Sequence, residues 1–245
     1  MHKSNHVFSL SKTPPQFANE FGTRTSVNRP SFPVLNGMAL YRLVLQPGGF
    51  REPQYSPEDI VIGGFQGKLD IPWTAGFSNH YKLAVESLPP LLATDFGSAR
   101  TARRQFWPVL EGLSMYSLRL LGTGMREPHW HPQTAEMGYV LQGNARMTLL
   151  SPKANVDTYL LGPGDMYFIP KGYPHHIENL TDEEMHFLIF FDKTTPEDIG
   201  FTGALAAFPR RIAGPTLGCT EETLPRIPAY PADLLVVEKI NPPLA

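Results

Sequence analysis

The second half of the chain contains short runs of apolar and β-branched residues, separated by glycine, proline or asparagine, and this pattern is typical of β-strands. Candidate strands are Tyr116–Leu121, Glu136–Gln142, Asn144–Leu150, Asp157–Leu161, Tyr167–Ile169, His175–Asn179 and Met185–Phe191. The last run is apolar on both faces, which predicts a central strand covered on both sides. Within these runs, we expect His186 to be a packed, hydrogen-bonded core residue and His176 to face outward.

The flanking segments have weaker patterns. Residues 1–28 are polar and irregular, which predicts an N-terminal arm. Residues 80–103 suggest a helix or an extended segment followed by a linker. After the last strand, Thr195 precedes Pro196 and two acidic residues, which is typical of a helix start. The proline-rich tail then ends in a possible strand, Leu234–Glu238.

A repeat relates the two halves of the chain. The segment Arg29–Tyr41 recurs as Arg104–Tyr116, 75 positions later, and the match continues without a gap. Over residues 29–57, 13 of the 29 positions are identical at this offset. Because both the spacing and the residues repeat, the pattern indicates a duplication.

The first copy lacks the histidines of the second. Gln54 stands where the second copy has His129, and Ser56 where it has His131. His80, near the end of the first copy, is read as an ordinary polar residue. The predicted organisation is therefore an arm (1–28), a shortened half without metal ligands (29–95), a complete barrel (104–192) and a lid, helix and C-terminal extension (193–245).

Composition narrows the class of protein. Hydrophobic residues make up 42% and charged residues 18% of the 245 residues, as in a globular protein, and 25 prolines and 21 glycines suit a turn-rich all-β chain. The net charge of −2, without a basic run, argues against nucleic acid and membrane partners. Cys219 is the single cysteine and the N-terminus lacks an apolar signal core, so we expect a cytoplasmic protein.

Four side chains of the second copy are candidate metal ligands: His129, His131, Glu136 and His175. His129 and His131 are two positions apart, so on a strand both imidazoles point to the same face. Three imidazoles and one carboxylate suit a divalent ion such as Mn, Fe, Ni or Zn. An inward-facing Glu136 without a cation would also carry a large desolvation cost.

The spacing of these residues resembles the two sequence motifs of the cupin superfamily. The motifs here are His129-x-His131-x4-Glu136-x6-Gly143 and Gly164-x5-Pro170-x-Gly172-x2-His175-x3-Asn179. The leading glycine of the first motif, Gly124, lies one residue closer to the histidine than usual. The resemblance implies a double-stranded β-barrel, or jelly roll, that holds one divalent metal inside its mouth and is followed by short helices.

The segment Arg126-Glu-Pro-His-Trp-His131 is similar to the oxalate decarboxylase-like group of bicupins. That resemblance implies an enzyme in which manganese and Arg126 bind a small carboxylate, and oxalate yields formate and carbon dioxide. It also implies a proton donor on a lid after the last barrel strand, where Glu197 aligns best, although the lid sequence departs from the family pattern. From spacing alone, an ion pair with Glu127 is an equal alternative for Arg126, and a helix start is an alternative for Glu197.

Other functions remain open, because one fold hosts many chemistries. One alternative is a cupin dioxygenase or isomerase that acts on another small oxygenated molecule. A second is a non-enzymatic module that binds a metal or ligand, which a site plugged by its own tail would favour. We also expect exposed barrel faces and arms to associate into a homo-oligomer.

Overall fold

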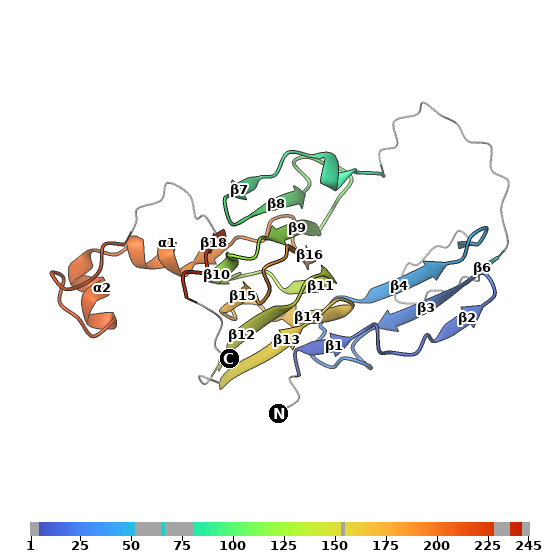
Figure 1. Ribbon diagram of the computed structural model, residues 1–245, viewed down its shortest axis with the longest axis horizontal. Coiled ribbons are helices and arrows are strands. Elements are labelled where there is room, and N and C mark those ends of the chain that lie inside the picture. Colours follow the sequence, from blue (N-terminus) through green and yellow to red (C-terminus); the bar gives the residue numbers. More distant parts are fainter. Residues whose placement is uncertain (1–4, 52–64, 67–80, 153–154, 228–235, 242–245) are drawn as a thin grey trace. The chain divides into compact units, whose positions relative to one another are not determined.

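A computed structural model describes residues 5–51, 65–66, 81–152, 155–227 and 236–241. The chain divides into two compact units, one formed by residues 1–7 and 81–245 and the other by residues 8–80. In the described ranges strands predominate, which confirms the predicted all-β class (Figure 1). No helix in those ranges is long and apolar enough to cross a membrane.

The larger unit contains two β-sheets, and only the last two residues of β1 fall outside its bounds. The first has the order β1 (Val7–Ser9), β14 (Asp165–Ile169), β11 (Glu136–Gln142), β16 (Met185–Phe191), β9 (Ser114–Leu120), β8 (Gly97–Ala102) and β7 (Leu92–Thr94). The second has the order β13 (Asn155–Leu161), β12 (Ala145–Ser151), β15 (His175–Asn179), β10 (Gly124–Trp130) and β17 (Ile199–Gly200), with β18 (Val236–Glu238) also paired to β10. Neighbouring strands in the second sheet are antiparallel.

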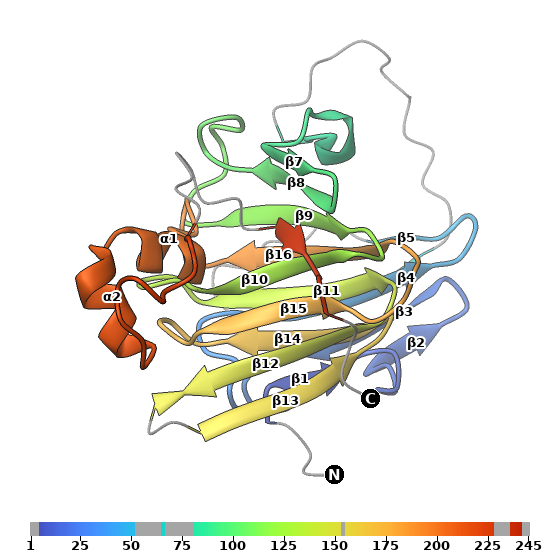
Figure 2. The same cartoon turned by 60° about the vertical axis from the view of Figure 1, so that its left-hand side comes forward.

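Helices are short and peripheral. A single 3-10 turn, Val85–Ser87, precedes β7 among the described residues. Helices α1 (Phe201–Ala206) and α2 (Arg210–Thr216) follow β17 and lie together at one end of the barrel strands (Figures 1 and 2). The strands therefore build the barrel, and the helices only border it.

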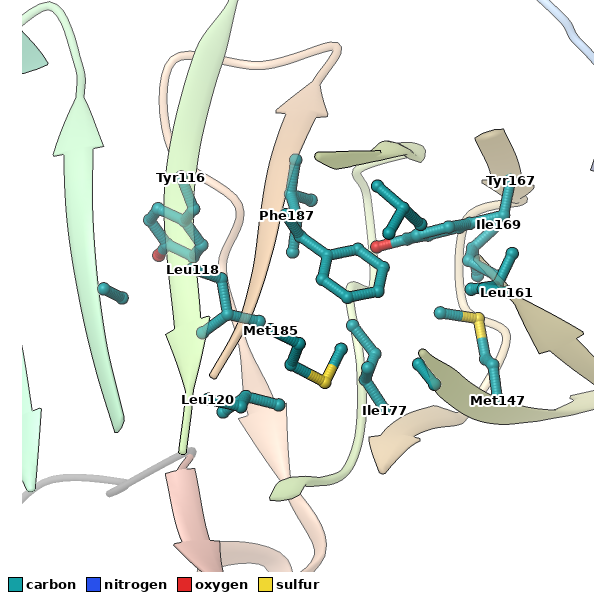
Figure 3. Packing of buried hydrophobic residues seen from close by; sticks show 14 of the residues in the cluster. Tyr116, Leu118, Leu120, Met147, Leu161, Tyr167, Ile169, Ile177, Met185 and Phe187 are labelled. Carbon is teal, nitrogen blue, oxygen red and sulfur yellow. The ribbon is translucent and has the colours of Figure 1, made fainter. Parts of the chain in front are cut away.

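The two sheets pack against each other across one apolar core. Leu118 and Phe187 come from the first sheet, and Met147 and Ile177 come from the second; all four are at most 2% exposed (Figure 3). Burial of a large apolar side chain contributes roughly 1.5–3 kcal/mol. This shared core holds the sheets together as a two-layered barrel.

The predicted strands of the second copy are present. Three of them, β11, β15 and β16, have the predicted bounds, and the others shift by a few residues. As predicted, β16 is central, because it lies between β11 and β9. His186 is 9% exposed and its Nε2 lies 2.8 Å from the hydroxyl of Ser117, so it is the packed, hydrogen-bonded residue expected.

The expected linker in residues 80–103 was wrong in part. Residues 92–94 and 97–102 form the hairpin β7–β8, and β8 pairs with β9 along its whole length. The side chains that β8 buries are small, such as Ala99 and Ala102. Small side chains give little hydrophobic contrast, so the alternating pattern of this strand is weak in the sequence.

The smaller unit contains two separate sheets. Strands β2 (Phe17–Asn19), β3 (Gly22–Val27) and β4 (Leu40–Leu45) form one, and β5 (Phe50–Arg51) pairs with β6 (Phe65–Gln66) in the other. The expectation of an irregular arm over residues 1–28 was therefore wrong, because Thr25 and Val27 are buried in a strand that pairs with β4. Gln54, Ser56 and His80 lie outside the described residues.

The predicted helix start at Thr195 was also wrong. Residues 193–198 are not helical, and α1 begins at Phe201 with Gly200 as its N-cap. The carbonyl oxygen of Pro196 lies 3.1 Å from Nδ1 of His131, so this backbone is hydrogen-bonded to the site rather than to a helical turn. Tertiary hydrogen bonds thus prevail over the local capping signal.

Candidate metal centre

A β-bulge in β10 lets the side chain of Arg126 point to the same face of the strand as those of His129 and His131. Arg126 pairs with Ile177 of β15, and His129 pairs with His175, so three steps on β10 match two on β15. Without the extra residue, positions 126 and 129 would face opposite sides of the strand. Pro128, which has no N–H to donate to a ladder, lies within this bulge.

The remaining two candidates come from the first residues of two other strands. Glu136 begins β11 and His175 begins β15. His129, His131, Glu136 and His175 are all at most 2% exposed, and one potential ligand atom from each lies within 4.8 Å of the others. The structure therefore brings together the four side chains that the sequence selected.

The inward atoms of this cluster are in close contact. Nε2 of His131 lies 2.8 Å from Oε2 of Glu136, and Nε2 of His175 lies 3.2 Å from the same oxygen. The rings of His129 and His175 have centroids 4.2 Å apart. Three nitrogens and one carboxylate oxygen thus converge on one small volume.

The outer ring nitrogens are held by oxygen atoms. Nδ1 of His129 lies 2.7 Å from the carbonyl oxygen of Glu127, and Nδ1 of His175 lies 2.9 Å from that of Tyr173. A carbonyl oxygen only accepts hydrogen bonds, so each of these Nδ1 atoms must carry the proton. In the neutral ring, the lone pair is then on Nε2 and points into the cluster, as metal coordination requires.

Charge within the cluster also suits a cation. Burial alone would raise the pKa of Glu136, but charge attraction and hydrogen bonds from His175 and His131 outweigh it and hold that pKa well below its ordinary value, so the carboxylate is anionic. These hydrogen bonds use a proton on Nε2, and a bound cation would take the place of that proton. Burial, with a further contribution from Arg126, holds the pKa of His129 well below 6.5, so that imidazole is neutral. The hydroxyl of Tyr167 donates to Oε1 of Glu136 at 2.6 Å and leaves Oε2 to face the histidines. This donor set fits a divalent metal ion.

Arg126 is buried beside the cluster rather than on the surface. Its side chain is 5% exposed, and its Nη2 donates to Oδ1 of Asp198 at 3.0 Å. The alternative partner, Glu127, accepts a 2.7 Å hydrogen bond from the hydroxyl of Thr202 in α1. The guanidinium therefore lies inside the barrel with the histidines of its own strand.

Glu197 and Asp198 differ in environment although they are adjacent. Glu197 is exposed and has a φ of 55°, a backbone conformation that non-glycine residues rarely adopt. Asp198 turns inward: its side chain is 9% exposed and contacts Arg126, His131 and Tyr116. Sequence reasoning missed Asp198, because two neighbouring acids after a proline carry no signal that tells which one faces the site.

Trp130 lies outside the cluster. It lines an apolar pocket of about 260 Å³ together with residues of α1 and α2, and its ring meets that of Phe201 edge-on at 5.7 Å. Residues 129 and 131 point to the histidine cluster, and residue 130 points to the opposite face of the chain, as strand alternation requires. Trp130 therefore belongs to the helix-facing side.

Sequence comparison identifies the second half of the chain. Residues 85–223 match the family model described as Cupin. Oxalate decarboxylase OxdC of Bacillus subtilis (strain 168) is 32% identical over 134 residues, which cover 54% of this chain and 34% of that protein. Germin-like protein subfamily T member 3 of Arabidopsis thaliana is 30% identical over 96 residues, which cover 39% of this chain and 42% of that protein.

Structural comparison extends the likeness in fold. A serine-to-alanine mutant of Bacillus subtilis oxalate decarboxylase OxdC superimposes with a TM-score of 0.81 and 16% identity, over 98% of this chain and 90% of that one. At this identity the match shows a common fold. Since the family model covers more than half of the sequence, the chain belongs to the cupin family.

Proposed function

We propose that this protein is a metal-dependent cupin enzyme that acts on a small carboxylate, with oxalate decarboxylation as the first candidate reaction. The observation that carries the proposal is a buried cluster of three histidines and one glutamate with a buried arginine beside it. The similarity of the chain to oxalate decarboxylase OxdC over 134 residues supports the choice of substrate class.

His129, His131, Glu136 and His175 would hold one divalent ion. Manganese is the first candidate, and iron, nickel and zinc fit the same donor atoms. One solved structure of the Bacillus subtilis relative is described by its Mn(II) centres, which supports this order. When bound, such an ion supplies Lewis-acid and, for manganese or iron, one-electron chemistry.

Arg126 would bind one carboxylate of the substrate. Its guanidinium offers several N–H donors in a planar fork that matches a carboxylate, and hydrogen bonds of this kind are strengthened where water is excluded. Burial inside the barrel provides that environment. The role of Arg126 is therefore to hold and orient an anion next to the histidines.

Oxalate decarboxylation consumes one proton. The oxalate dianion and a proton give carbon dioxide and formate, with no net oxidation. We propose Glu197 as the donor, because it lies in the segment that follows the last barrel strand and is next to Asp198, which reaches the site. Its side chain is exposed here, so proton transfer requires Glu197 to turn inward. Without a donor at that position, the chemistry would shift toward oxidation of oxalate by dioxygen, in which oxalate, dioxygen and two protons give two molecules of carbon dioxide and one of hydrogen peroxide.

A second candidate is a non-enzymatic metal-binding cupin. The observation that favours it is that the chain covers its own site: Pro196 and Asp198 contact His131, and Asp198 also contacts Arg126. A dioxygenase or isomerase that acts on another small oxygenated molecule is a further alternative within the same metal site.

The test is a metal and substrate screen. Metal-free protein is loaded separately with manganese, iron, nickel and zinc, and formate and carbon dioxide are measured with oxalate as substrate. We expect turnover with manganese and a loss of at least about 100-fold in Arg126→Gln, as for removal of a charge-stabilising donor. Turnover of a different acid or a diketone would redirect the assignment, and no turnover of any substrate would favour the binding module.

We also propose that the protein self-associates and works in the cytoplasm. Exposed apolar side chains on described elements, such as Leu160 at 63% and Phe208 at 59%, support association. Light scattering across a range of concentrations tests this, and a monomer at every concentration contradicts it. Fractionation of the producing cells tests the compartment.

A further inference from the structure

We infer that Asp198 is a positioning residue that fixes His131 and Arg126 relative to each other, so that metal retention depends on it. The inference rests on the proposed function, because it takes the histidine cluster as a metal site. It concerns a residue outside the four ligands and adjacent to the proposed proton donor.

One carboxylate makes all three contacts. Oδ1 of Asp198 lies 3.0 Å from Nη2 of Arg126 and 3.1 Å from Nδ1 of His131. Its other oxygen, Oδ2, accepts a hydrogen bond of 3.0 Å from the hydroxyl of Tyr116. Asp198 therefore connects Arg126 of β10, and His131 just after it, to Tyr116 of β9 in the other sheet.

The contact with His131 acts on the face opposite the metal. The Nδ1 hydrogen bond goes to the carbonyl oxygen of Pro196, and the carboxylate oxygen of Asp198 at 3.1 Å further favours the tautomer with its proton on Nδ1 and its lone pair on Nε2. The carbonyl oxygen of Pro196 lies at the same distance of 3.1 Å, so the backbone and side chain of one segment hold the same nitrogen. Carboxylates in this position commonly contribute about 10–100-fold to metal affinity.

The contact with Arg126 gives the buried carboxylate of Asp198 a cationic partner. An isolated carboxylate at 9% exposure would carry a large desolvation cost, and a guanidinium at 3.0 Å offsets it. The same bond orients the guanidinium. Asp198 thus positions both the metal ligand and the group proposed to hold the substrate.

The backbone fixes where Asp198 points. The two residues after it form β17, which pairs with β10 so that Gly200 lies opposite His129 and Ile199 opposite Trp130. The backbone of Asp198 therefore lies beside β10, and its short side chain points into the barrel. Glu197, one position earlier, is exposed.

The test compares Asp198→Ala and Asp198→Asn with Glu197→Gln, the adjacent acid, in the full chain. Manganese affinity is measured by competition with a metal-binding dye. We expect Asp198→Ala to bind about 10–100-fold more weakly and Asp198→Asn, which keeps an acceptor oxygen, to lose less. Glu197→Gln should retain wild-type affinity while losing turnover under the proposed mechanism.

Two further measurements separate positioning from folding. The unfolding temperature of each metal-free variant shows whether the barrel is intact. The electron paramagnetic resonance spectrum of bound manganese reports the ligand geometry, and we expect it to change in Asp198→Asn. If Asp198→Ala does not fold, Asp198→Asn carries the test.

The outcomes are distinguishable. Wild-type affinity and spectrum in both Asp198 variants would overturn this inference and leave the metal site standing. A wild-type protein that binds no divalent ion would overturn the proposed function and this inference with it. Metal binding without oxalate turnover would change the substrate and leave the role of Asp198 intact.

Discussion

The two copies of the repeat share one backbone scaffold and differ in what surrounds it. Strands β2, β3 and β4 of the first copy recur as β7, β8 and β9 of the second. Their registers are related by the same offset of 75: Gly22 pairs with Leu45, and Gly97 pairs with Leu120. The structural repeat therefore begins at Phe17, 12 residues before the sequence repeat.

The turns of the two copies are equally alike. The backbone N–H of Gln46 donates to the carbonyl of Phe21 at 2.9 Å, and Leu121 donates to Phe96 at the same distance. In each copy a glycine three positions later folds back onto that carbonyl: Gly49 in the first and Gly124 in the second. The two copies thus share the same backbone hydrogen bonds and the same close contact between a glycine and a carbonyl oxygen.

Burial separates the copies. Strand β9 lies between β8 and β16 and is buried at five of its seven positions, whereas β4 pairs only with β3 among the described strands and has no buried position. The sequence also places Gln54 and Ser56 where the second copy has His129 and His131. The candidate metal ligands are therefore found in the copy whose scaffold is covered by further described strands.

The largest difference to test is metal binding. His131→Ala removes from the second copy a ligand that the first copy lacks, and we expect its metal content to fall from about one divalent ion per chain to near zero. Elemental analysis after dialysis measures this. His176→Ala is the matched control, because His176 is next to His175 but does not belong to the cluster. Equal metal content in both variants would contradict the assigned ligands.

Truncation of equivalent leucines should reveal the difference in burial. Leu118 is 2% exposed, whereas Leu43, 75 positions earlier, is only partly buried. We expect Leu118→Ala to lower the free energy of unfolding by about 2–5 kcal/mol and Leu43→Ala by less than about 1.5 kcal/mol. Denaturant unfolding followed by tryptophan fluorescence and circular dichroism measures both. Equal losses would show that the first copy is covered as fully as the second.

Equivalent glycines should respond alike, because the scaffold is the same. A Cβ on Gly22 would lie 2.4 Å from the carbonyl oxygen of Val44, and one on Gly97 would lie 2.3 Å from that of Arg119. We expect Gly22→Ala and Gly97→Ala each to destabilise its own unit by roughly 1–3 kcal/mol, since backbone must shift. Hydrogen exchange resolved by unit measures this, with Gly162→Ala as a control, because a Cβ there would meet only side-chain oxygens at 3.3 Å and beyond. A large loss at only one site would argue against equivalent backbones.

Substitution of the equivalent tyrosines should have the smallest effect on stability. Tyr116 is bonded through its hydroxyl to Asp198 and Arg103, whereas Tyr41, its counterpart, lines a polar pocket of the first copy. We expect Tyr116→Phe to cost about 1 kcal/mol and Tyr41→Phe to have little effect. Thermal unfolding of the two variants measures the difference. A neutral Tyr116→Phe would show that the hydroxyl contributes no net stability.

Several features of the site followed from the sequence because they are local. Period-two alternation places His129 and His131 on one face, and the strands that carry Glu136 and His175 were predicted with their observed bounds. Turn residues and apolar runs act over a few positions, so they can be read without the fold. The four-residue cluster was therefore accessible from spacing and resemblance.

Other features depended on partners far along the chain. The environment of Arg126 was undecided between two alternatives until the bulge turned it inward to Asp198, 72 positions later. The helix expected at Thr195 gave way to hydrogen bonds with His131. No local pattern contains these partners, because they are defined by which strands meet.

The sequence by itself determined the strand period, the duplication and the identity of the four candidate ligands, since each depends on residue type and short spacing. Only the tertiary structure decided that β7 and β8 join the barrel, that Arg126 is buried, and that Asp198 rather than Glu197 reaches His131. The physical reason is that buried polar groups take their hydrogen-bond partners from whatever the fold brings within about 3 Å, regardless of separation along the chain.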